Sequence, residues 1–408
     1  MSLSTLQALT DEAHALAVGD LSRSRLTQAE TEVARQLHIC NACRYCEGFC
    51  AVFPAMTRRL AFGPADVHFM ANLCHNCGAC LHACQYAPPH EFAVNIPQAM
   101  ARVRGHTYTA FAWPPALGRL YQRNGVTVAV ALVVSLCLLI GLVLFSQGRL
   151  WGLPSQGTGF YAVLPHNLMV ALFAPVFLWA VLALGLGVRR FWRGITPATS
   201  GAASSAAPAA PPSAPVTPAA AAEATSHVLQ LTYLGGGHGE GCNNDSDAFS
   251  LARRHAHHLT FYGFLLCFAA TSIATVYHYV FGWSAPYALP SLPKLLGAVG
   301  GVSLSVGTMW LWRLHHQRHP LQGDAAQAPM DLAFIALLFA TSTTGLLLWW
   351  LGQTPAMPLV LALHLSCVLA LFITLPYGKF AHGIFRTAAL LRHAVEQRLP
   401  NRLGLGGE

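Results

Sequence analysis

Long apolar stretches alternate with shorter polar segments along this chain of 408 residues. A helix needs about 20 consecutive apolar residues to cross a bilayer. Six stretches approach or exceed that length, at residues 126–146, 166–188, 258–281, 293–313, 330–351 and 358–380. The pattern predicts a mostly α fold with a bundle of about six transmembrane helices.

The polar segments divide the rest of the chain. The opening residues are mildly amphipathic, and the tract after the second span is so rich in Ala, Pro, Ser and Thr that it cannot bury enough apolar surface to order itself. The predicted divisions are an N-terminal helical segment at 1–36, a cysteine-rich domain at 37–110, the first two spans at 111–193, a disordered linker at 194–226, a Gly-rich cytoplasmic loop at 227–256, the last four spans at 257–385 and a cytoplasmic tail at 386–408.

Composition and charge support a membrane protein. Hydrophobic residues make up 54% of the chain and charged residues only 10%, against about a quarter in an ordinary soluble domain. The net charge is +8, but the basic residues flank the spans, which argues against a nucleic-acid partner. Loops on one side hold nearly all the Lys and Arg, and the opposite loops hold only Arg149 and Lys294. With no signal peptide at the start, we expect the head and both termini in the cytoplasm.

Eight of the twelve cysteines fall in two short runs before residue 85. Both runs have the spacing C-x2-C-x2-C-x3-C, in which three thiolates hold one 4Fe–4S cluster and the fourth reaches the other cluster. The spacing predicts a ferredoxin-like head with two 4Fe–4S clusters. The predicted ligands are Cys40, Cys43, Cys46 and Cys84 for the first cluster, and Cys74, Cys77, Cys80 and Cys50 for the second.

Structural zinc is the alternative for these runs, although zinc sites usually show separate pairs of C-x2-C cysteines. One departure from bacterial ferredoxins is that no proline directly follows the fourth cysteine of either run. Cys137, Cys267 and Cys367 lie inside apolar spans, where a thiol usually acts as a small hydrophobic group. Cys242 lies in the Gly-rich loop and is either inert or functional.

Histidines inside the spans are candidate haem ligands, since ionisable groups at membrane depth are costly and mark function. His257 and His258 begin the third span, and His278 lies near its end. His364 and His382 are 18 residues apart in the last span, which is five turns of a straight helix. Because these two spans run antiparallel, His278 is predicted level with His364, and the His257/His258 pair level with His382.

This arrangement predicts two bis-histidine haem b sites stacked across the membrane. One haem and none remain alternatives. In a straight helix His257 shares the face of His278 better than His258 does. His166, just after Pro165, is either a helix-start residue or a substitute distal ligand, whereas histidines such as His255, His315 and His316 are interpreted as interfacial.

These motifs carry a resemblance to a known family. The cysteine runs, the GGGHGEGCN loop, RRHAHHLTFYGFLLCFAATSIATVYHY and HLSCVLALFITLPYGKFAHGIFR together resemble the tricarballylate-utilisation B family, also called citrate-utilisation B proteins. The likeness covers nearly the whole chain except the linker. The last span alone is similar to the final helix of respiratory nitrate reductase gamma subunits, in which the histidines that match His364 and His382 bind haem.

The resemblance implies a bacterial inner-membrane electron carrier. In that family the B protein reoxidises a separate FAD-dependent dehydrogenase, the A protein, which converts tricarballylate to cis-aconitate, and passes the electrons towards membrane quinone. No G-x-G-x-x-G fingerprint follows a strand in this chain, so the flavin is expected on the partner.

Two other functions are alternatives. One is an electron-transfer subunit of a different flavoprotein or of a complex like heterodisulfide reductase or nitrate reductase. The other is a cluster-bearing redox sensor or transporter. Against a transporter, the spans lack paired acidic residues at mid-membrane, and Asp331 lies at a span edge.

Overall fold

The computed structural model describes residues 26–154, 159–196 and 214–401. Regular structure in these ranges is helical, apart from one isolated antiparallel bridge between Cys242 and Ser250. Six helices are long and apolar enough to cross a membrane. The predicted mostly α fold with six spans is therefore confirmed. Of the expected N-terminal helical segment, residues 1–25 lie outside the described ranges.

The helices form a head, a membrane bundle and two further helices that join them. The head contains α2 (Gln28–Cys43), α3 (Val52–Met56), α4 (Pro64–Leu73), α5 (Ala79–His82) and α6 (Ile96–Phe111). The candidate spans are α7 (Asn124–Gln147), α8 (His166–Ile195), α10 (Ala252–Phe281), α11 (Leu292–His316), α12 (Ala328–Leu351) and α13 (Met357–Thr374). The further helices are α9 (Pro218–Gln230) and α14 (Ala381–Gln397).

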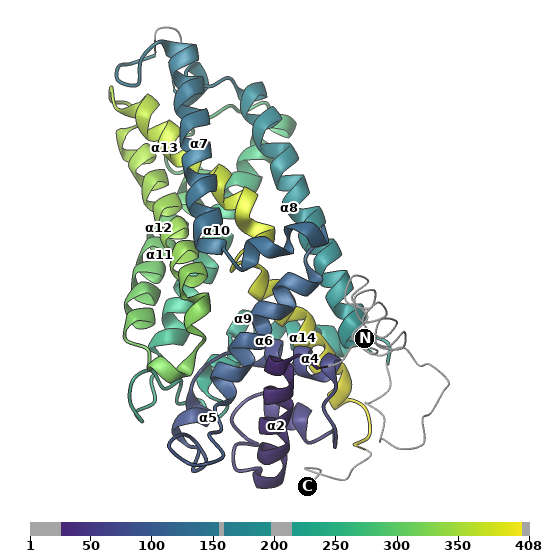
Figure 1. The fold of residues 1–408 in the computed structure, drawn as a ribbon. Helices are drawn as coiled ribbons and strands as arrows, with labels where there is room; N and C mark the ends of the chain where they lie inside the picture. The colour runs from purple at the N-terminus through teal and green to yellow at the C-terminus, as the bar shows by residue number, and fades with distance from the viewer. Residues whose placement is uncertain (1–25, 155–158, 197–213, 402–408) are drawn as a thin grey trace, which may run out of the picture.

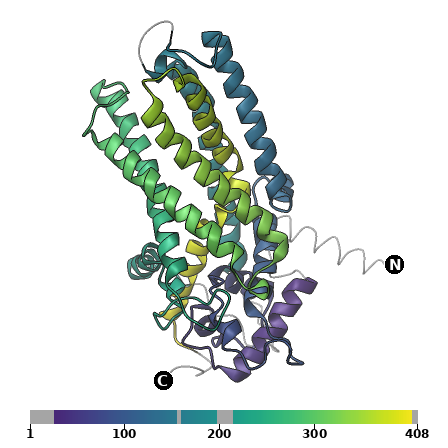
Figure 2. The same ribbon diagram turned by 90° about the vertical axis from the view of Figure 1, so that its left-hand side faces the viewer.

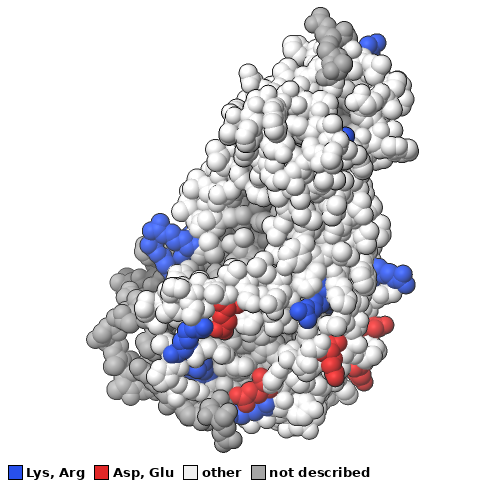
Figure 3. Space-filling model, turned by 180° about the vertical axis from the view of Figure 1, so that it is seen from behind, with Lys and Arg blue, Asp and Glu red and all other residues white. Residues whose placement is uncertain are grey.

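The head lies at one end of the membrane bundle. Figure 1 shows α2, α4, α5 and α6 below the long helices, and the view in Figure 2 shows the same separation. Charged side chains gather on the lower part of the surface in Figure 3, while most of the upper part carries none. Such a surface suits an apolar bundle in lipid with a head in water.

Glycines let the backbones of α10 and α11 approach each other closely. A Cβ atom on Gly300 would lie 2.9 Å from the backbone nitrogen of Cys267, and one on Gly263 would lie 2.6 Å from that of Leu304. Small residues let the backbones of membrane helices approach and gain van der Waals contact. These glycines therefore fix the position of α10, which carries three of the candidate histidines.

The head shares its hydrophobic core with two helices from distant parts of the sequence. Phe69 of α4 and Phe111 of α6 are fully buried, and Phe111 contacts Phe191 near the C-terminal end of α8. Phe191 contacts Phe385 of α14, at a ring-centre distance of 4.9 Å. Burial of each such side chain stabilises the folded protein by roughly 1.5–3 kcal/mol. The head is thus packed directly onto α8 and α14.

The last span was predicted as one helix at 358–380, and this prediction is wrong. The helix α13 ends at Thr374, a 3-10 turn covers Leu375–Tyr377, and α14 starts at Ala381. Pro376 lacks a backbone N–H and cannot continue the α-helical hydrogen bonding. Asn124 donates a buried hydrogen bond to the carbonyl oxygen of Tyr377 at 2.8 Å. His364 and His382 therefore lie on different helices, and the five-turn argument does not apply to them.

Two other boundaries also differ from prediction. The expected disordered linker at 194–226 ends in helix α9, whose Ala220 and Ala224 are buried; residues 197–213 lie outside the described ranges. The expected tail at 386–408 is mostly α14, which is amphipathic and packs into the head with Phe385 buried. Small apolar side chains on one face of α9 bury enough surface to order it against α14, which a compositional argument cannot detect.

Candidate metal centres

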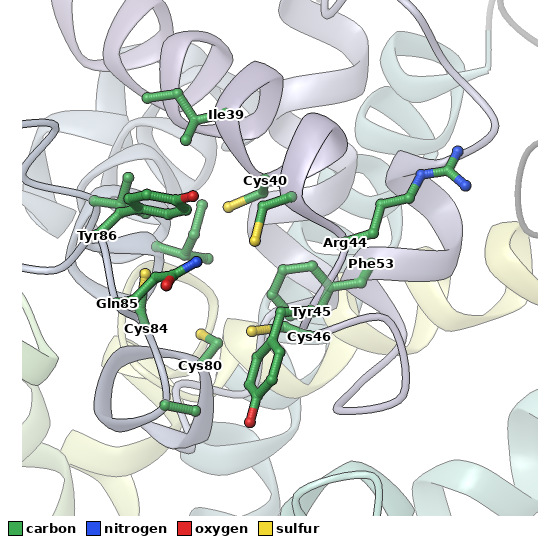
Figure 4. Close-up of a pocket in the computed structure, with 14 residues that line it drawn as sticks. Ile39, Cys40, Arg44, Tyr45, Cys46, Phe53, Cys80, Cys84, Gln85 and Tyr86 are labelled. Carbon is green, nitrogen blue, oxygen red and sulfur yellow. The ribbon is translucent and has the colours of Figure 1, made fainter.

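The first predicted ligand group surrounds one cavity in the head. This cavity has a volume of about 280 Å³ and is lined by all four predicted cysteines, Cys40, Cys43, Cys46 and Cys84. Figure 4 shows Cys40, Cys46 and Cys84 around this space, with Cys80 at its border. Cys43 is exposed, and the neighbouring Tyr45 ring is 70% exposed. This group therefore lies at the aqueous edge of the molecule.

The thiols of this group influence one another electrostatically. Burial, followed by the charges of Cys46, Cys84 and Cys43, raises the pKa of Cys40 to about 12. Burial, followed by the charges of Cys84, Cys43 and Cys77, raises the pKa of Cys46 to about 12. A bound cation would remove this repulsion by holding the thiolates, with release of their protons.

The second predicted ligand group lies deeper in the head. Cys74 and Cys77 are buried, and Cys50 and Cys80 are partly buried. Burial, then the charges of Cys77 and Cys74, raises the pKa of Cys50 well above its usual value. The fourth cysteine of each run lies near cysteines of the other run: Cys50 is near Cys74 and Cys77, and Cys84 is near Cys40. The assignment of these cysteines as cluster ligands stays a prediction.

Local backbone geometry turns each run around its centre. The helix α2 ends at Cys43, and Arg44 adopts a left-handed conformation with φ 59°. In the second run Gly78 has φ 84° directly before α5. A residue with positive φ reverses the chain direction sharply, so successive cysteines of one run face a common point.

These residues fit iron–sulfur clusters better than single metal ions. In the described ranges, no three His, Cys, Asp or Glu side chains are grouped closely enough to hold one metal ion. Instead, four cysteines border a cavity, and cysteine thiolates are the ligands that 4Fe–4S clusters use. Thiolate ligands arranged around a space suit a cubane, whereas zinc draws its sulfur atoms to about 2.3 Å from one point.

The guanidinium groups of a buried and a partly buried arginine lie beside the second ligand group. Arg104 of α6 and Arg386 of α14 each donate a hydrogen bond to the carbonyl oxygen of Cys74, both at 2.9 Å. Neither arginine takes part in any ion pair found in the described part of the chain. Buried charge is costly unless it is compensated. These cations fit a site whose bound group is negatively charged.

His257 of α10 and His382 of α14 face each other next to this second group. Their ring centres are 6.2 Å apart with the ring planes at 72°. If one nitrogen of each ring bound the same iron at about 2 Å, the ring centres would be about 6 Å apart. Nδ1 of His382 contacts the carbonyl oxygen of Lys379, which leaves Nε2 for a ligand. Nδ1 of His257 is buried with no hydrogen-bond partner. The pair therefore fits haem ligation.

The second group and this histidine pair are close neighbours. Burial lowers the pKa of His75 well below its usual value, and Arg386 and His257 lower it further. Arg386 lies four residues after His382, one turn along α14. His258 instead faces α9, where the Gln230 and Leu229 backbone contacts it. The structure thus separates His257 from His258, which the sequence left open.

The remaining predicted histidines are not paired as expected. His278 stacks on His166 of α8, with ring centres 3.9 Å apart and planes at 24°, and His166 contacts the Tyr279 hydroxyl at 3.1 Å. Nδ1 of His364 contacts the Thr344 hydroxyl of α12 at 3.2 Å. The second haem site, with His278 and His364, stays a prediction. His166 is the first residue of α8, directly after Pro165, as the helix-start interpretation predicted.

Sequence reasoning missed Arg104 and Arg386, because nothing in the local pattern distinguishes them from arginines at a membrane boundary. It flagged Cys242 without a role. Cys242 is 2% exposed and lies against Cys77; the hydrogen bond between them lowers the pKa of Cys77 and raises that of Cys242. Its position in the Gly-rich loop was the sequence feature that could have indicated a role for Cys242.

Comparison with known proteins covers both parts of the chain. The family model described as "Citrate utilization protein B Fer4-like domain" matches residues 33–110, and the model "Citrate utilization protein B" matches residues 119–402. Citrate utilization protein B of Escherichia coli is 53% identical over 383 residues, which cover 94% of this chain and 97% of that protein. No solved structure matches.

Proposed function

Because the chain belongs to the citrate utilization protein B family, we propose that it carries electrons from a flavoprotein dehydrogenase to the membrane quinone pool. Its Fer4-like head and six apolar helices make it an iron–sulfur, multi-pass membrane protein of citrate or tricarballylate utilisation. The donor we propose is an FAD-dependent tricarballylate dehydrogenase. When bound, two 4Fe–4S clusters and haem b would supply one-electron chemistry.

One observation carries the proposal: the candidate ligand groups form a continuous series from water to membrane. Cys40, Cys43, Cys46 and Cys84 lie at the exposed edge of the head. Cys50, Cys74, Cys77 and Cys80 lie between that edge and α14. Arg386 contacts the second group and lies one turn from His382, which faces His257 on a span. A short series of redox sites is what electron transfer across a boundary requires.

The protein's own part is to hold the sites and adjust their potentials. Arg104 and Arg386 place positive charge beside the second group, which favours the more negative, reduced state of a bound cluster. Burial of His257 and His382 excludes water from the haem ligands. Ligand, hydrogen bond and burial are the means by which proteins set redox potentials.

The dehydrogenase is proposed to dock over the first ligand group. Cys43 is exposed there, and the 70% exposed Tyr45 ring offers a surface of the kind enriched at protein interfaces. The excess of Lys and Arg on this side of the spans supports a head in the bacterial cytoplasm, where such a dehydrogenase would work.

Absorption and EPR spectra of the full chain, purified without oxygen, test the proposal. We expect about eight iron atoms in clusters per chain, two interacting 4Fe–4S signals after reduction, and a b-type haem band. Mixing with the purified FAD-dependent dehydrogenase, tricarballylate and a soluble quinone should reduce the quinone only when both proteins are present. Zinc in place of iron and sulfide, or no haem band, contradicts the proposal.

A further inference from the structure

The Gly-rich loop after α9 closes over the second ligand group. Gly237 has φ 88°, and a Cβ atom there would lie 2.0 Å from the carbonyl oxygen of Phe49, next to Cys50. Gly241 has φ 116°, and a Cβ atom would lie 2.2 Å from the carbonyl oxygen of Ser250. Both positions need glycine for conformation and for space. The loop backbone is therefore pressed against the segment that leads into a predicted ligand.

Polar side chains fasten this loop to the run that contains Cys74 and Cys77. Arg253 donates to the carbonyl oxygen of Asn76 at 2.7 Å and to the side-chain oxygen of Asn244 at 3.0 Å. Gln322 donates to the carbonyl oxygens of Asn76 at 3.0 Å and of Asn243 at 3.2 Å. Arg253 lies in the first turn of α10, and Gln322 lies in the short connection between α11 and α12. They hold loop and ligand run in one fixed arrangement.

Cys242 is the side chain that this arrangement brings to the second ligand group. It is 2% exposed and belongs to one small buried cluster with Cys77, Ala79 and Leu234. Its thiol donates a hydrogen bond to the Leu234 carbonyl oxygen at 3.3 Å and shares that buried cluster with Cys77, the other sulfur within it. Both predicted ligand sets are complete without it. The neighbouring Asn243 is 1% exposed and has an oxygen with no partner, so the pocket contains further unused polar groups.

We propose that Cys242 is a positioning residue whose S–H group donates a hydrogen bond to Cys77 and raises the reduction potential of the second cluster. As a cluster ligand, Cys77 carries negative charge and becomes a stronger acceptor than the Leu234 carbonyl. A hydrogen bond to a ligand sulfur stabilises the more negative reduced cluster. The proposal rests on the proposed function only in that Cys77 holds a cluster.

The consequence is a difference between the two clusters. The first group lies at an exposed cavity edge, and the further cysteine that lines this cavity, Cys80, is itself a predicted ligand of the second group. The second group receives the Cys242 thiol and the positive charges of Arg104 and Arg386. Electrons that enter at the exposed edge would then move towards the cluster with the higher potential, which is the one near the membrane.

An EPR-monitored redox titration of the full chain tests this. In Cys242→Ala we expect the second-cluster signal at lower potential, with the first-cluster signal and the iron content unchanged. Cys242→Ser, which keeps a donor at this position, should restore part of the shift. The second-cluster signal is identified by its loss in Cys74→Ser. Cys367→Ala, at a buried cysteine of α13, is the matched control and should leave both potentials unchanged.

Two results overturn the proposal. Unchanged potentials in Cys242→Ala would show that the thiol donates only to Leu234. Loss of iron or conversion of the second cluster in both Cys242 variants would make Cys242 a ligand instead of a hydrogen-bond donor. Absence of both clusters from the unaltered chain would instead contradict the proposed function, so the two failures are distinguishable.

Discussion

The Arg386 guanidinium donates a hydrogen bond to the carbonyl oxygen of Cys74 across 2.9 Å, although 312 residues separate them in the sequence. This contact joins the second ligand group to α14, the helix that carries His382. Burial and the nearby Arg104 lower the pKa of Arg386 to about 10, yet it stays charged at neutral pH. A fixed positive charge therefore lies between the candidate cluster and the candidate haem.

Replacement of Arg386 by Met should lower the reduction potential of the second cluster, because the variant removes a cation that stabilises the reduced state. The first cluster lies farther away and should keep its potential. Redox titration followed by EPR measures both. Arg102→Met, at an exposed arginine of α6, is the control and should change neither potential. Equal shifts in both variants would mean that net charge, and not this contact, sets the potential.

His257→Ala and His382→Ala should each abolish haem binding at the proposed site between these residues, because each variant removes one of its two histidine ligands. The pyridine haemochrome content should fall to zero if the chain binds one haem, and by about half if it binds two. His258→Ala is the matched control, since this neighbour faces α9. Haem loss in His258→Ala with retention in His257→Ala would reverse our assignment.

The sequence was sufficient for the elements whose signal is local. Apolar length predicted the six spans that the structure contains. The paired spacing of eight cysteines placed Cys50 and Cys84 near the other run, and their assignment to two ligand groups stays a prediction. These features depend on residues close together in the chain. Helical length and turn geometry follow from such residues without knowledge of the tertiary fold.

The sequence could not supply features that depend on contacts between distant segments. The break after Thr374 was overlooked because Pro376 and Gly378 were read as the soft end of a span, and Asn124 caps the break from another helix. The pairing of His278 with His166 depends on how α8 and α10 approach each other. Register arguments assume straight helices, so they could rank His257 over His258 but could not identify its partner.

Gly300→Val should destabilise the bundle, because the added side chain would overlap the backbone of α10 at Cys267. Overpacking of this kind costs typically about 1–3 kcal/mol, and more where backbone must move. We expect a lower thermal midpoint and less monodisperse protein in detergent. Gly141→Val is the matched control, since nothing lies within 4 Å of a Cβ atom there on α7. Equal behaviour of the two variants would contradict the packing we describe.

Glu396→Gln should loosen α14 from the head. Arg59 pairs with Glu396 at 2.6 Å and with Asp66 at 2.5 Å, and the Arg59–Glu396 pair has almost no solvent exposure. Removing one partner of a buried ion pair costs about 3–5 kcal/mol, since the other charge stays buried. Faster hydrogen exchange along α14 measures the effect. Glu240→Gln, at an exposed acid of the Gly-rich loop, should leave α14 unchanged.

The same contact predicts how the head responds to acid. Burial raises the pKa of Glu396, but Arg59 and Arg392 lower it by more, so its pKa lies below the usual 4.5. The folded head then binds fewer protons than the unfolded chain, and this stabilisation is full above pH 4.5 and is lost as the pH falls through the lowered pKa. Burial also lowers the pKa of His393 from 6.5 to about 4. The folded head therefore loses further stability as the pH falls below 6.5. Hydrogen exchange of α14 should accelerate between pH 7 and pH 4 in the unaltered chain. In Glu396→Gln the acceleration below pH 4.5 should be smaller, with the His393 contribution remaining. A profile identical to that of the unaltered chain would show that this carboxylate is not the group that holds α14 in place.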